Sequence, residues 1–137
     1  MNIIIIDGQG GMLGAQLVRE ISAKYPDLNL SAVGTNAAAT ATMIKAGAKR
    51  AATGENPVIV ACRKADVIIG PIGIVIADSL YGEVTPAMAL AVAQSDATRI
   101  LLPVNRCDNI IVGISDLSTS SLIADVISKL DKILQEV

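Results

Sequence analysis

The first 24 residues of the chain read as a strand joined to a helix by a glycine-rich turn. The segment 2–7 contains an unbroken run of isoleucines, Ile3–Ile6, which is typical of a strand covered on both faces. Glycines follow at positions 8, 10, 11 and 14, and apolar residues recur at helical spacing from Leu13 to Ile21. Pro26 then ends the helical pattern. These features predict the opening unit of a parallel α/β sheet.

Strand and helix patterns alternate along the rest of the chain. We predict further strands at 28–34, 50–53, 66–70, 98–104 and 109–114, with helices at 37–46, 56–64, 85–95 and 122–134. Asn56 and Thr85 each precede a proline and are predicted to cap their helices. Right-handed crossovers favour one doubly wound, mainly parallel, Rossmann-like domain over residues 1–137. We expect three layers and the strand order 3-2-1-4-5-6.

The composition excludes several classes of function. The chain has no histidine, so it contains no Ser-His-Asp triad, Cys-His pair or HExxH zinc site, and we expect no metal site. A net charge of −2 argues against nucleic-acid binding, which needs a basic surface. Apolar residues make up 52% and charged residues 18%, which leaves little polar material for the surface and favours a homo-oligomer. The alternative is a compact domain with an unusually apolar sheet.

Three features favour a cytoplasmic location. No basic segment precedes the apolar run at the start of the chain, and no cleavage site follows it, as a secretory signal would require. Cys62 and Cys107 lie far apart and form no CxxC motif, which fits free thiols in a reducing compartment. The uncharged run 67–77 is too short to cross a membrane. We therefore expect a cytoplasmic protein without a membrane partner.

The glycine turn predicts a phosphate site where the first strand ends. Glycine permits positive φ angles and lets an anion approach backbone N–H groups at the start of the helix, where the helix dipole favours negative charge. The candidate residues of this turn are Gly8, Gln9, Gly10, Gly11, Met12 and Gly14. No acidic residue follows in the first helical turn, so we expect nothing there to repel an anion. The alternative is a turn whose glycines serve packing alone.

Other segments are expected to meet this turn, because ligands of such sheets bind at the carboxyl ends of the strands around the switch point. Thr35 and Asn36 could hydrogen-bond a ribose. Gly70, Pro71, Ile72 and Gly73 would form a facing wall, or simply a turn set by glycine and proline.

The candidates for substrate binding are Thr85, Asn105 and Arg106. Thr85 could open a second anion site or only cap its helix. Arg106 suits a carboxylate or phosphate, or is a surface arginine. Cys107 is a possible nucleophile or an inert thiol, since no histidine base is present.

Three acidic residues are also open to two interpretations. Asp7 could orient a ribose or substrate, or shape the turn as Asp-Gly pairs often do at strand ends. Asp78 and Glu83 follow the fourth predicted strand and are possible acid/base groups or exposed carboxylates.

The spacing of Gly8, Gly11 and Gly14 resembles the Gly-x-x-Gly-x-x-Gly turn of the extended short-chain dehydrogenase/reductase family. The resemblance implies that these glycines bind the pyrophosphate of NAD or NADP. It implies no reduction mechanism, because the Tyr-x-x-x-Lys dyad of that family is absent: Asn29 and Thr85 stand four residues after the two tyrosines. The second strand also ends without an Asp or Glu for an NAD ribose, and without an Arg for a 2′-phosphate.

Over nearly its full length the chain resembles a small bacterial family known only as a domain of unknown function. The residues that carry this resemblance are 7–11, 34–36, 52–56, 65–73, 85–89 and 102–107. It implies a Rossmann-like fold in a bacterial cytoplasm, and it does not point to any particular activity.

We therefore predict a protein that binds a nucleotide, with NAD(P) among the candidate cofactors. An enzyme acting on a small phosphorylated or carboxylated metabolite and a structural oligomeric subunit without ligand are the alternatives.

Overall fold

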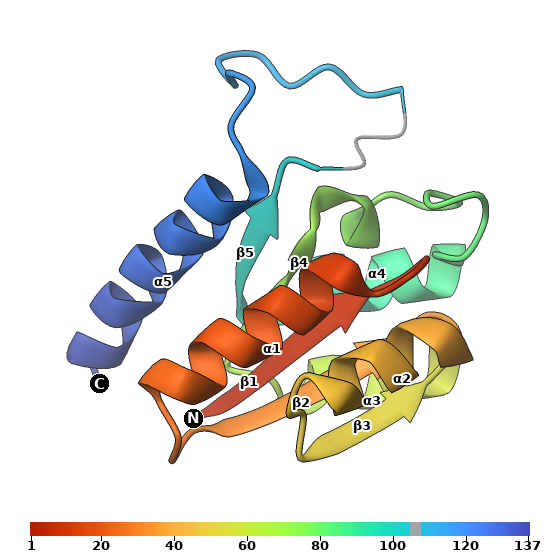
Figure 1. Ribbon diagram of the computed structural model, residues 1–137. Helices are drawn as coiled ribbons and strands as arrows, with labels where there is room; N and C mark the ends of the chain where they lie inside the picture. The colour runs from red at the N-terminus through yellow and green to blue at the C-terminus, as the bar shows by residue number, and fades with distance from the viewer. Residues whose placement is uncertain (105–107) are drawn as a thin grey trace.

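Five parallel strands form one sheet in the order β3-β2-β1-β4-β5 (Figure 1). The computed structural model describes residues 1–104 and 108–137. The strands are β1 (Asn2–Asp7), β2 (Asn29–Gly34), β3 (Arg50–Thr53), β4 (Val67–Pro71) and β5 (Thr98–Leu102). Asp7 pairs with Gly34 on one side of β1, and Ile5 pairs with Ile69 on the other. The predicted fold class and the order of the first five strands are confirmed.

The sixth strand predicted at 109–114 is wrong. The described residues of this stretch join no strand of the sheet, and they belong to the long connection between β5 and α5 that extends away from the layers in Figure 1. Ile110 is 92% exposed and Val112 is 94% exposed. Gly113 has a φ of 85°, which interrupts extended backbone. An apolar run becomes a strand only where a sheet edge pairs with it, and none does so here.

Helices cover both faces of the sheet (Figure 1). On one face lie α1 (Met12–Lys24), α2 (Ala37–Lys45) and α5 (Thr119–Gln135), and on the other lie α3 (Glu55–Lys64), the short 3-10 helix η1 (Ile72–Val75) and α4 (Pro86–Gln94). Within the described ranges, no helix is long and apolar enough to cross a membrane.

The two predicted helix caps have different outcomes. Thr85 caps α4 as expected, because its side-chain oxygen accepts a hydrogen bond from the N–H of Met88 at 3.1 Å. The Asn56 cap is wrong, since α3 begins at Glu55 after Gly54. Gly54 has a φ of 108°, a conformation that favours glycine, and it turns the chain into the helix without a side-chain cap.

Alternate residues of β1 face two separate apolar clusters. Ile3 and Ile5 pack against α1, α2 and α5, and Ile4 and Ile6 pack against α3 and α4. Full burial of each such side chain stabilises the fold by roughly 1.5–3 kcal/mol. The isoleucine run is therefore covered on both faces as predicted, and it fixes Asp7 and the glycine turn at the centre of the sheet.

Candidate functional site

The glycine turn connects β1 to α1 at the carboxyl edge of the sheet, and three of its four glycines are required by packing. A Cβ atom on Gly8 would lie within 3 Å of Thr35 and of Leu80, and one on Gly14 would lie 2.6 Å from the Sδ of Met43. The N-cap of α1 is Gly11, which has a φ of 74° and lies against the backbone of α2. Gly10 differs from these three, because its Cβ would meet nothing nearer than a side-chain carbon 4.0 Å away.

Asp7 holds the turn together from inside. Its carboxylate accepts hydrogen bonds from the N–H of Gly8 at 2.8 Å and the N–H of Gly14 at 2.7 Å. Its side chain is buried, with 4% of the residue exposed. Burial raises the pKa of Asp7 by more than these two hydrogen bonds lower it, and the nearby charge of Glu83 raises it further. Asp7 thus shapes the turn, the simpler of its two predicted roles.

A second carboxylate lies on the outer side of the turn. Oε1 of Glu83 accepts hydrogen bonds from the N–H of Gln9 at 2.9 Å, the hydroxyl of Thr35 at 2.8 Å and Nδ2 of Asn36 at 2.6 Å. Partial burial raises the pKa of Glu83, but these three hydrogen bonds outweigh it and the pKa lies below its ordinary value. The first turn of α1 has no acidic residue, as expected, but Glu83 brings a negative charge to the glycine turn from a distant segment.

Three backbone N–H groups of the turn have no hydrogen-bond acceptor among the residues that the structure describes. They belong to Gly10, Met12 and Leu13, whereas the N–H groups of the other glycines and of Gln9 are bonded internally. The first turn of α1 contains no acidic residue, and both Gly10 and Met12 are exposed. The start of α1 therefore offers an anion three backbone donors without an internal acceptor, two of them on the exposed residues Gly10 and Met12.

Thr35 and Asn36 lie beside the glycine turn, where the second strand was predicted to deliver them. The N–H of Thr35 donates to the carbonyl of Asp7 at 2.9 Å. Asn36 caps α2 by accepting from the N–H of Ala39 at 2.8 Å, and its Nδ2 also donates to the carbonyl of Gln9 at 3.0 Å. Both side chains also donate to Glu83, so they position this carboxylate as well as the turn.

The segment Gly70–Gly73 packs within the protein more than it faces a crevice. Gly70 lies against the backbone of Ile6, and Pro71 ends β4. Gly73 is buried and its carbonyl accepts a hydrogen bond from the hydroxyl of Ser79, while Ile72 is partly exposed.

Of the predicted substrate-binding residues, Thr85 is the only one that the structure describes, and its hydroxyl caps α4. The other two, Asn105 and Arg106, lie outside the described residues, as does Cys107.

A cavity of about 440 Å³ opens next to the turn. Its lining includes Gln9, Asp108 and the segment 76–81 between η1 and α4. This segment carries Tyr81, which is 99% exposed and has a φ of 55°, while the neighbouring Leu80 is buried and anchors the segment in the core. A groove of about 450 Å³ on the apolar face of β2, β3 and α3 includes none of the turn residues, so it is separate from this site.

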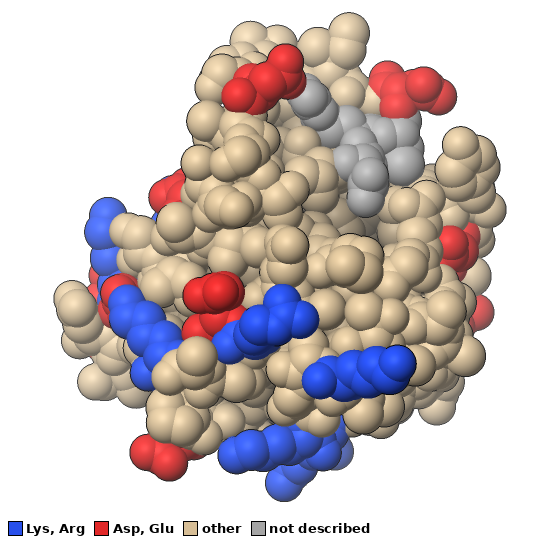
Figure 2. Space-filling view, viewed as in Figure 1, with Lys and Arg blue, Asp and Glu red and all other residues tan. Residues whose placement is uncertain are grey.

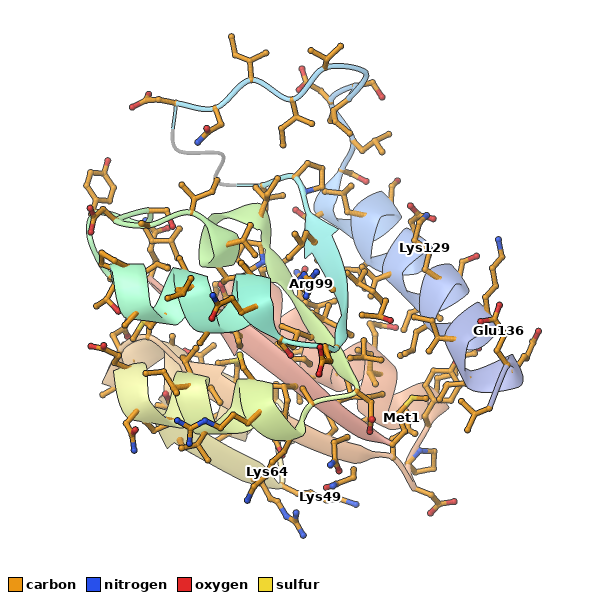
Figure 3. All side chains as sticks on the ribbon, turned by 180° about the vertical axis from the view of Figure 1, so that it is seen from behind. Met1, Lys49, Lys64, Arg99, Lys129 and Glu136 are labelled. Carbon is orange, nitrogen blue, oxygen red and sulfur yellow. The ribbon has the colours of Figure 1, made fainter. Side chains whose placement is uncertain are left out.

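Charge is distributed unevenly between the two edges of the sheet. In the face shown in Figure 2, Lys and Arg lie over the lower half together with some Asp and Glu, whereas the upper end shows Asp and Glu alone. Lys49 and Lys64 extend from the lower edge in Figure 3. Lys49 directly precedes β3, and Lys64 is the last residue of α3, shortly before β4. The carboxyl edge carries the carboxylates of Asp7 and Glu83. Within residues 1–104 and 108–137, groups that suit an anion at this edge include the backbone N–H groups at the start of α1 and the helix dipole.

The comparisons with known proteins concern the whole domain. A family model matches residues 2–135, from β1 to the last turn of α5, and its description is Domain of unknown function (DUF3842). No curated protein and no solved structure matches the chain significantly. These comparisons show no link to the short-chain dehydrogenase/reductase family that the glycine spacing resembles.

Proposed function

The chain belongs to the family described as Domain of unknown function (DUF3842), and from that premise we propose that it binds a nucleotide at the carboxyl edge of its sheet, with NAD(P) as the first candidate. One observation carries the proposal. The three open N–H groups of Gly10, Met12 and Leu13 lie at the start of α1, beside the switch point between β1 and β4. Parallel α/β sheets bind ligands at this place.

The phosphate of the nucleotide would lie on these three donors. Successive N–H groups at a helix start are suited to bind phosphate oxygens, and the dipole of a 13-residue helix favours the negative charge. Gly10 leaves open space above the backbone, so a phosphate approaches without meeting a side chain. The carboxylate of Glu83 restricts the phosphate to this end of the turn, because it already occupies the N–H of Gln9.

The base of the nucleotide would lie toward Tyr81. This ring borders the same cavity as Gln9 and is almost fully exposed, in a chain with only two tyrosines and no tryptophan or phenylalanine. An exposed aromatic ring next to a polar turn can stack on a planar heterocycle, which contributes roughly 1–3 kcal/mol per base in nucleic-acid complexes. Tyr81 and Gln9 thus line one cavity, and Gly10, the residue after Gln9, provides the first of the phosphate donors.

Binding alone accounts for the described groups better than a reaction does. Both carboxylates at the turn accept hydrogen bonds from the protein, and burial raises the pKa of the Cys62 thiol to about 11, which makes it a poor nucleophile at neutral pH. In the alternative enzyme, Arg106, Asn105 and the Thr85 end of α4 would hold the anion, and the reaction would depend on Asp78, Glu83 or Cys107. Residues 105–107 lie outside the described residues.

Thermal unfolding with added nucleotides tests the proposal. We expect NAD and AMP to raise the melting temperature, since a ligand at 100 times its Kd stabilises the native state by about 2.7 kcal/mol. Adenosine, which lacks the phosphate, should raise it less than AMP. Absence of any shift with NAD, NADP, ATP, AMP and FAD at millimolar concentration would overturn the proposal.

Self-association is a second proposal and rests on a different observation. The segment between β5 and α5 exposes Ile110, Val112 and Leu117, and exposed apolar side chains in close succession are typical of interaction surfaces. We expect light scattering to show a homo-oligomer for the wild type. The double variant Ile110→Ser, Val112→Ser should have a smaller molar mass in solution. A wild-type chain that stays monomeric at high concentration would contradict this.

A further inference from the structure

The carboxylate of Glu83 has one oxygen fixed by the protein and one left open. Oε1 receives all three hydrogen bonds, from Gln9, Thr35 and Asn36. Oε2 has no partner in the part of the chain that the structure describes. A carboxylate held in this way is a pre-oriented acceptor, because the three donors have already fixed its position and the second oxygen still has lone pairs to fill. Its natural complement is a group that donates hydrogen bonds.

The position of Glu83 relative to the open N–H groups matches the layout of a nucleotide. Glu83 is bonded to the N–H of Gln9, and the next residue, Gly10, provides the first open N–H group. Consecutive Cα atoms lie about 3.8 Å apart, so Glu83 is bonded one residue along the backbone from the first phosphate donor, Gly10. A phosphate on Gly10 would therefore place the adjoining ribose within reach of Glu83.

Glu83 also takes the place of the acidic residue that the second strand lacks. Acceptor carboxylates for the ribose of NAD ordinarily follow the second strand of a dinucleotide-binding sheet. Here Thr35 and Asn36 follow β2, and both donate to a carboxylate that arrives from the segment between η1 and α4. The chain thereby regains, from a distant segment, the acceptor that the end of β2 does not itself supply.

A phosphate on the ribose hydroxyl would meet an unfavourable environment. The donors of Thr35 and Asn36 are already directed at the carboxylate of Glu83, so a phosphate placed there would meet that negative charge. Lys49 and Lys64, both labelled in Figure 3, extend from the opposite edge of the sheet and therefore do not bring a positive charge to such a phosphate. Like charges at close range repel strongly where water is partly excluded.

We infer that the site selects a nucleotide whose ribose carries free hydroxyl groups and rejects one with a 2′-phosphate, so that it takes NAD and excludes NADP. This inference rests on the proposed nucleotide function. The assigned role of Glu83 is to accept hydrogen bonds from the ribose through Oε2, with Thr35 and Asn36 as its positioning residues.

Calorimetric titration of the wild-type protein with NAD and NADP separates the inference from the proposed function. We expect the Kd for NAD to be at least about tenfold lower than that for NADP. Equal affinities would overturn the selectivity and leave the nucleotide site standing. Binding of neither dinucleotide would overturn the proposed function itself. This comparison needs no variant, so it does not depend on whether a substitution folds.

Two variants then assign the selectivity to Glu83. Glu83→Gln keeps the shape and removes the charge, so we expect it to weaken NAD binding, strengthen NADP binding and bring the ratio of the two Kd values close to one. Glu55→Gln removes a carboxylate at the start of α3 and should leave both Kd values unchanged. A Glu83→Gln variant that keeps the wild-type ratio would show that another group discriminates between the two ligands.

Discussion

Replacing Gly11 by alanine should destabilise the protein whether or not a ligand is present. Gly11 has a φ of 74°, and an L-residue in this left-handed region costs about 1–2 kcal/mol. The new methyl group would lie 2.7 Å from the Cα and the carbonyl oxygen of Ala39, which are backbone atoms of α2. Forcing an extra carbon into such a contact costs about 1–3 kcal/mol. We therefore expect a loss of about 2–5 kcal/mol in the free energy of unfolding.

Gly10→Ala is the matched control, because it makes the same chemical change one residue earlier. The Cβ at this position meets nothing within 4.0 Å, and Gly10 does not adopt a positive φ. We expect the free energy of unfolding to change by less than about 1 kcal/mol, since alanine also reduces the entropy of the unfolded chain.

Urea unfolding followed by circular dichroism measures both variants. The two-state slope of the transition shows whether the unfolded state itself has changed. The packing argument is refuted if Gly11→Ala is as stable as the wild type, or if Gly10→Ala loses as much stability as Gly11→Ala.

Three further predictions concern neighbouring groups. The pKa of Glu83 is lowered in the folded state, so Glu83 stabilises the fold above its ordinary pKa of 4.5, and this stabilisation is lost as the pH falls through the folded-state pKa. The difference in unfolding free energy between the wild type and Glu83→Gln should therefore shrink on acidification. A difference that stays constant with pH would contradict this. Asp7 has a raised pKa and acts in the opposite direction, and Glu83→Gln removes only the smallest cause of that shift, the nearby charge of Glu83, so most of the effect is common to both proteins. Tyr81→Ala should leave the melting temperature unchanged and weaken NAD binding about tenfold, and unchanged affinity would argue against stacking. Thr85→Ala should cost about 1 kcal/mol of stability through loss of the α4 cap, and unfolding midpoints that match the wild type would show otherwise.

The sheet could be predicted from the sequence because its signals are local. The isoleucine run of β1, the helical spacing that follows it and the Thr85-Pro86 start of α4 each act within a few residues. Right-handed crossovers then leave few strand orders. The predicted strand at 109–114 has a similar local pattern, but a strand also needs a neighbouring edge, and the local pattern carries no information about one.

The site was harder to predict because its decisive contacts are long-range. Glu83 meets Gln9 across 74 residues and Asn36 across 47. No spacing rule connects these positions, and in the sequence Glu83 is one of two acidic residues, with Asp78, in an irregular segment. The role of the glycines in the turn also depends on contacts that the sequence does not show. The sequence reveals small residues at Gly8, Gly11 and Gly14, but only the fold shows that side chains and backbone of the chain itself occupy the space beside them.

The central claim is that the phosphate of a nucleotide binds to the open backbone N–H groups at the start of α1. Amide NMR spectra recorded during titration with AMP test it most directly, because each N–H group gives its own signal. We expect the signals of Gly10, Met12 and Leu13 to move furthest and saturate together, while those of Gly8 and Gly14, which are bonded to Asp7, move least. A saturating titration in which these three signals stay in place would contradict it.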